Sequence, residues 1–97
     1  MTTTIEHRLY QGDLAREILE NEVFQSVFDD IEKEVIEQWT QTPARDAEGR
    51  EKCYQYLMML RKLKAQITAT LETGKLAQLD LQHKQSLADR VKAGLGL

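Results

Sequence analysis

Few side chains in this sequence have the types and spacing that enzyme chemistry requires. The two histidines, His7 and His83, lie in segments without a clear hydrophobic period, and nothing places either beside a serine and a carboxylate. Asp80 and His83 stand three residues apart, which on a helix places both side chains on one face. Two-metal helical bundles need a Glu-x-x-His motif from each of two helices together with further carboxylates. We therefore predict no metal site at this pair, and no cofactor.

The other candidate catalytic groups also lack the surroundings that catalysis needs. Cys53, the only cysteine, has no candidate base near it in the sequence and lies on an apolar stripe, which predicts a small core residue. Glu32, Glu34 and Glu37 read as a solvated acidic helix face, whereas catalytic carboxylates are usually buried or closely paired. The glycines do not form a phosphate-binding loop. We predict that the protein has no catalytic residues and is not an enzyme.

The basic residues Arg61, Lys62 and Lys64 have two interpretations. They match a stripe that contacts phosphates, and they match a solvated face that balances the acidic helix. Net charge is −3, with −7 over residues 1–40 and +4 over residues 41–97. Nucleic-acid-binding domains are usually strongly basic, so we favour the solvated face. The opposite charges of the two halves indicate self-complementarity, within the fold or between copies.

These side chains must be positioned by helices, because five glycines and one proline leave few places for turns. Asp13 is expected to cap a short helix over 14–19, and Asn21 to cap a longer one from 22 to about 40. One continuous helix through Asn21 is the alternative. Pro43 ends the longer helix. Asp46 caps the next helix, which should stop at Gly74 before a short last helix.

Both long segments carry one apolar stripe at helical spacing. The stripe of 22–40 contains Phe24, Phe28, Ile31, Val35 and Trp39. That of the following helix contains Cys53, Leu57, Leu60, Ile67 and Leu71, and Lys64 interrupts it. The predicted fold is all-α, an antiparallel helical hairpin of two long amphipathic helices with short N-terminal and C-terminal helices. We expect one domain over 1–97, with flexible ends at 1–12 and 93–97, and no segment that spans a membrane.

Stripes of this width have more apolar surface than a single hairpin contact buries, so the pattern predicts homo-oligomerisation. The candidate interface residues are aromatic or long apolar side chains on the two long helices. They are Tyr56, Met59, Leu63, Phe28 and Trp39.

Several patches of the chain together resemble small helical accessory proteins from the structural and packaging gene region of tailed bacteriophages. They are Leu19-Glu20-Asn21-Glu22-Val23-Phe24, Ile36-Glu37-Gln38-Trp39, Thr42-Pro43, Arg45-Asp46-Ala47-Glu48-Gly49-Arg50-Glu51 and Thr73-Gly74-Lys75-Leu76-Ala77. The resemblance covers about residues 14–77 and carries no active site with it.

The resemblance implies a non-enzymatic bacteriophage protein that acts in virion structure or assembly. Its expected partners are other copies of itself and other phage virion proteins. Its expected location is the host cytoplasm during infection, with the virion as the alternative. One alternative is a small phage-encoded regulator that binds a host or phage protein. Another is a DNA-packaging accessory protein that contacts nucleic acid directly, through residues such as Arg61, Lys62 and Lys64.

Overall fold

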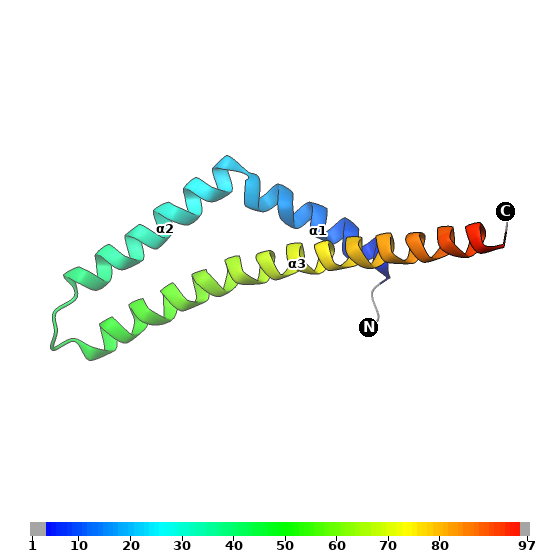
Figure 1. Ribbon diagram of the computed structural model, residues 1–97. Helices are drawn as coiled ribbons and strands as arrows, with labels where there is room; N and C mark the ends of the chain where they lie inside the picture. The colour runs from blue at the N-terminus through cyan, green and yellow to red at the C-terminus, as the bar shows by residue number, and fades with distance from the viewer. Residues whose placement is uncertain (1–3, 96–97) are drawn as a thin grey trace. The chain divides into compact units, whose positions relative to one another are not determined.

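The computed structural model describes residues 4–95, and the elements within this range are helices only (Figure 1). Three helices follow one another along the chain: α1 (Ile5–Glu20), α2 (Glu22–Gln41) and α3 (Ala47–Gly94). The prediction of an all-α protein is confirmed. Of the predicted flexible ends, residues 1–3 and 96–97 lie outside the described residues, while residues 5–12 and 93–94 are helical. Within residues 4–95 we find no helix with an apolar stretch long enough to cross a lipid bilayer.

The side chains of Asn21 and Asp46 cap α2 and α3, as the sequence predicts. Asn21 has an extended backbone, and its Oδ1 accepts a hydrogen bond from the Phe24 backbone N–H at 2.9 Å. Asp46 Oδ1 accepts a hydrogen bond from the Gly49 backbone N–H, also at 2.9 Å. Each bond satisfies an N–H group of the first turn that has no partner inside the helix. The break at Asn21 is therefore confirmed, and the alternative of one continuous helix is wrong.

The start of α1 differs from the prediction. The helix begins at Ile5, not after Asp13, because Thr4 provides the cap. The Thr4 hydroxyl accepts a hydrogen bond from the His7 backbone N–H at 3.1 Å. Hydrophobic periodicity misses this first part of α1 because its buried residues are Gly12 and Ala15, which give little apolar signal.

The prediction that a helix ends at Gly74 and a separate C-terminal helix follows is wrong, because α3 continues through Gly74 to Gly94. A glycine inside a helix costs only about 1 kcal/mol relative to alanine, so it need not end one. Gly74 is buried, and its nearest neighbour outside its own helix is the Gly12 backbone of α1. The absence of a side chain at Gly74 therefore serves a contact between helices.

The described chain forms two compact units. Unit 1 combines the chain up to Arg16 with the part from Ala69 on, and unit 2 is Glu17–Thr68. Unit 1 thus pairs most of α1 with the C-terminal part of α3. Unit 2 pairs α2 with the N-terminal part of α3. That the chain is a single domain stays a prediction.

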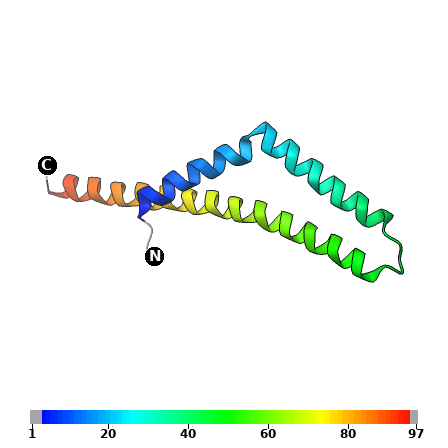
Figure 2. The same cartoon turned by 180° about the vertical axis from the view of Figure 1, so that it is seen from behind.

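In unit 1, α1 and α3 lie side by side (Figures 1 and 2). The backbones of Gly12 and Gly74 are in close contact there. A Cβ atom at Gly74 would lie 2.8 Å from the Gly12 Cα and 3.2 Å from the Arg8 carbonyl oxygen. Ala15 and Ala77 are buried, with 4% and 0% of their surface exposed. Unit 1 is therefore packed by backbone and small side chains, which permit a close approach of two helices.

In unit 2, α2 and α3 run in opposite directions, since Phe28 contacts Lys64 whereas Trp39 lies beside Cys53. Phe28 and Cys53 are buried, each with 5% of its surface exposed. Phe24 packs against Phe28 at 6.0 Å between ring centroids. The α3 residues that face α2 are spaced alternately by four and three, which is typical of a coiled-coil seam. We call the following the seam residues: Cys53, Leu57, Leu60, Lys64 and Ile67 on α3, and Phe24, Phe28, Glu32 and Val35 on α2.

We predict that Gly74→Ala destabilises unit 1, although alanine is the better helix former. The added methyl would overlap the Gly12 backbone, and overpacking of this kind costs about 1–3 kcal/mol. Gly94→Ala is the matched control, because a Cβ there meets nothing within 4 Å. Urea unfolding followed by circular dichroism should show a lower free energy of unfolding for Gly74→Ala only. Equal stability of the two variants would contradict the close crossing.

Candidate interaction surfaces

The side chains with catalytic or metal-binding potential are dispersed. Within the described residues no three His, Cys, Asp or Glu side chains lie close enough together to hold a metal ion. Asp80 forms an ion pair with Lys84, at 3.6 Å between Oδ2 and Nζ. Cys53 is a free, buried thiol and belongs to the core of unit 2, as predicted.

Two of the three residues proposed as phosphate contacts interact with other side chains of unit 2. Arg61 donates a hydrogen bond to Glu32 at 3.1 Å between Nη2 and Oε1, and the two form an ion pair. The Lys64 ammonium lies over the Phe28 ring, 4.8 Å from its centroid. This cation–π contact explains how a lysine occupies a seam position. Lys62 is exposed. A phosphate stripe would have to compete with both contacts, and it stays a prediction.

The structure separates the five predicted interface residues into surface and core. Tyr56, Met59 and Leu63 are exposed by 61%, 64% and 54%, and Trp39 by 51%. Phe28 is buried in the core of unit 2, and its assignment to an interface stays a prediction. Its position in the middle of the α2 stripe directs it at α3, where Lys64 covers its ring. The other four lie on the surface, where a partner can reach them.

Exposed apolar side chains greatly outnumber buried ones. Among the described residues, four hydrophobic side chains are buried and eighteen large apolar or aromatic side chains are exposed. Single exposed hydrophobic residues are normal on a protein surface, but contiguous groups mark interaction sites. In unit 2 two such groups can be traced, one on each side of the seam.

The first group, which we call the groove flank, surrounds an apolar groove of about 390 Å³ between α2 and α3. Its floor contains Cys53 and Leu57. Its exposed apolar members are Ile36, Trp39, Tyr54 and Met58, and Arg61 lines one side. The signal for this surface was present in the sequence, because Tyr54, Met58 and Ile36 each follow a seam residue by one position.

The second group, which we call the ridge flank, consists of residues that each precede a seam residue by one position. On α3 these are Tyr56, Met59 and Leu63, and on α2 Val23, Val27 and Ile31. All six are exposed, by 40–69%. Their spacing of three and four residues places each set of three in a row along its helix.

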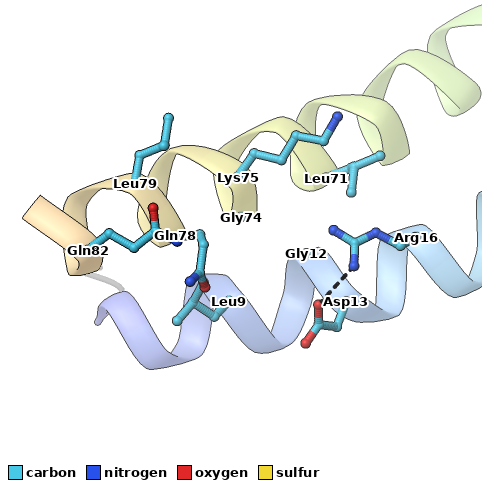
Figure 3. A pocket seen from close by; sticks show the side chains of 10 residues that line it. All are labelled: Leu9, Gly12, Asp13, Arg16, Leu71, Gly74, Lys75, Gln78, Leu79 and Gln82. Atoms are coloured by element: carbon cyan, nitrogen blue, oxygen red, sulfur yellow. Dashed lines mark ion pairs between the residues drawn. The ribbon is translucent and has the colours of Figure 1, made fainter.

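Unit 1 has an open groove of about 510 Å³ beside the crossing of Gly12 and Gly74 (Figure 3). The groove is lined by charged and amide side chains together with leucines. Of the charged ones, Asp13 pairs with Arg16 at 3.6 Å, and Lys75 pairs with Glu72 at 3.4 Å. An ionic ligand of this groove would have to compete with these exposed ion pairs. The flanks of unit 2 are the better candidates for recognition.

Comparisons of this chain with protein-family models, with curated protein sequences and with solved structures find no match. The resemblance to phage accessory proteins therefore stays a prediction, and the surfaces of the molecule carry the functional argument.

We predict that substitution of a core residue of unit 2 destabilises the protein much more than removal of a partly exposed ion pair. Phe28→Ala should lower the free energy of unfolding by about 3–5 kcal/mol, because it leaves a cavity and removes the ring beneath Lys64. Arg61→Ala should lower it by only about 0–1 kcal/mol, since the Arg61–Glu32 pair is partly exposed to water. Urea titrations of both variants measure the difference. Similar losses for the two would contradict the placement of Phe28 in the core.

Proposed function

We propose that this protein is a non-enzymatic interaction protein that acts by helix-mediated homo-oligomerisation. The observation that carries this proposal is the surface of unit 2, where both flanks expose large apolar side chains beside a narrow core. Leaving such surface in water is unfavourable, at about 25 cal/mol per Å². Association with further helices removes the surface from water without any change in the fold of the unit.

The associating element that we propose is the antiparallel helical hairpin of α2 with the N-terminal part of α3. The α3 residues of its seam have coiled-coil spacing, and coiled-coil pairs commonly assemble further into bundles. Tyr56, Met59 and Leu63 extend from it, so they are available to a second copy. Aromatic side chains and methionine are enriched at protein interfaces.

Apolar burial rather than charge attraction is the proposed driving force. The −7/+4 division of charge between the two parts of the sequence favours complementary orientation of copies. The ion pairs of the structure that involve Arg16, Lys75 and Lys84 are exposed and local, and such pairs contribute only about 0–1 kcal/mol each. Charges therefore select orientation, and the apolar flanks supply the affinity.

We place this activity in bacteriophage virion structure or assembly, on the resemblance of residues 14–77 to phage accessory proteins. In that setting the partners are other copies of the chain and other virion proteins. The proposed location is the host cytoplasm during infection, with the virion as the alternative. An assembly protein of this kind needs surfaces for neighbouring proteins and no catalytic centre. In the described residues, the His, Cys, Asp and Glu side chains form no group of three that could hold a metal ion.

We predict that light scattering of the protein at micromolar concentration reports a dimer or larger species. Leu63→Glu or Tyr56→Glu should release monomers, because each places a charge in an exposed surface that association would bury. Gln55→Glu is the control, since it adds the same charge on the exposed side of α3 away from both flanks. Raising the salt concentration should change the mass little. A strictly monomeric wild type would defeat the proposal, and strong dissociation by salt would show that charges hold the assembly.

We further predict that mass spectrometry detects the chain in purified particles of the phage that encodes it. Its absence from the particles, together with capture of one host or phage protein, would assign the chain to a regulator instead. Salt-sensitive binding of duplex DNA, weakened by Lys62→Ala, would assign it to genome packaging. Each result selects one role for the same helical surfaces.

A further inference from the structure

We infer that copies of this protein associate head to tail, with the ridge flank of one copy seated in the groove flank of the next. The inference rests on the proposed oligomerisation and names the surfaces that form the contact. The ridge flank of each copy then binds the groove flank of one neighbour, and its groove flank binds the ridge flank of another neighbour.

The two flanks lie on opposite sides of the hairpin. One residue along a helix corresponds to a rotation of about 100°, since there are 3.6 residues per turn. Groove residues such as Tyr54 and Met58 follow seam residues by one position, whereas ridge residues such as Met59 and Leu63 precede them by one. Because α2 and α3 are antiparallel, residues that follow a seam position on either helix emerge on the same side, as Ile36 does beside Tyr54.

The flanks differ in shape in a way that suits them to each other. On the groove flank, Ile36 and Met58 are only 38% and 36% exposed, and they border a hollow of about 390 Å³. On the ridge flank, Tyr56, Met59 and Val23 are 61%, 64% and 69% exposed, so they extend further into solvent. Protruding side chains of one copy therefore meet a concave surface on the next. A contact of two ridge flanks would leave both grooves in water.

The apolar area is sufficient for a specific contact. An aromatic side chain buries about 150–250 Å² and an aliphatic one less, so a ridge of one tyrosine and five aliphatic side chains, each about half exposed, offers on the order of 500 Å². An equal area on the groove flank brings the total to roughly 1,000 Å², the lower limit of specific interfaces. Charge does not oppose the contact. The ridge flank carries Lys52 and Glu34, and the groove flank carries Asp29 and Arg61, so each flank has both signs.

A contact between two different surfaces is heterologous, and its repetition gives a closed ring or an open filament. Two-fold dimers, in contrast, join identical surfaces and leave the other flank free. The head-to-tail contact is the one that covers both apolar flanks of every copy with a single type of interface. It also covers the mouth of the groove above Cys53.

Mixing two variants tests the inference. Trp39→Glu damages the groove flank, and Met59→Glu damages the ridge flank, and both positions are exposed, so the fold of the monomer should survive. Circular dichroism checks that it does. In a head-to-tail assembly each variant retains one working flank but lacks the complementary one, so each alone should have the monomer mass of 11.2 kDa. A 1:1 mixture should contain heterodimers of twice that mass, because the ridge of Trp39→Glu fits the groove of Met59→Glu.

Native mass spectrometry of the separate variants and of the mixture provides the readout, with Gln55→Glu as a control that should assemble like the wild type. A variant that dimerises alone would overturn the inference in favour of contacts between identical flanks. A mixture that stays monomeric beside an oligomeric wild type would overturn it as well, while leaving the proposed oligomerisation intact. A monomeric wild type would overturn both.

Discussion

A pair of helices can bury only one stripe of each, and this limit governs the whole protein. In unit 1 most of α1 has one segment of α3 to pack against, and in unit 2 α2 has another. No further layer exists in either unit within the described residues to cover the sides of the pair. Residues one position before or after the seam therefore remain at the surface even when they are large and apolar. The exposed apolar flanks of unit 2 are a direct result of this geometry.

The two units fill the buried stripe between their helices with different side chains. Unit 1 uses glycine and alanine, so its helices approach closely at Gly12 and Gly74 and bury backbone as well as side chains. Unit 2 uses Phe28 with Cys53 and half-buried leucines, and an apolar groove remains between its helices beside Trp39. Both units expose large apolar side chains, Leu76 and Leu79 of unit 1 among them, and those of unit 2 lie on both sides of its seam. The proposed recognition surfaces are the flanks of unit 2, which border an apolar groove.

Lys64 shows how a charged residue is accommodated in the seam of unit 2. A lysine at a seam position ordinarily weakens a helix pair, because removing an ammonium group from water is costly. Here the group lies over the Phe28 ring and remains near solvent, which retains hydration and adds a favourable contact with the ring. The neighbouring Arg61 reaches across to Glu32. The basic cluster thus joins α3 to α2, in addition to any role it has toward a partner.

The sequence by itself determined the features that depend on neighbours along the chain. Helix caps at Asn21 and Asp46, the end of α2 before Pro43 and the apolar stripes all arise from interactions within one or two turns. Only the tertiary structure decided what depends on a partner helix: the burial of Phe28, the groove beside Trp39 and the role of Gly74. In the sequence, Gly74 looks like the glycine that ends a helix. Only the Gly12 backbone opposite it explains why a glycine stands inside a helix that continues. Local hydrogen bonds can be read from adjacent residues, but a glycine that permits contact is recognisable only beside the surface it contacts.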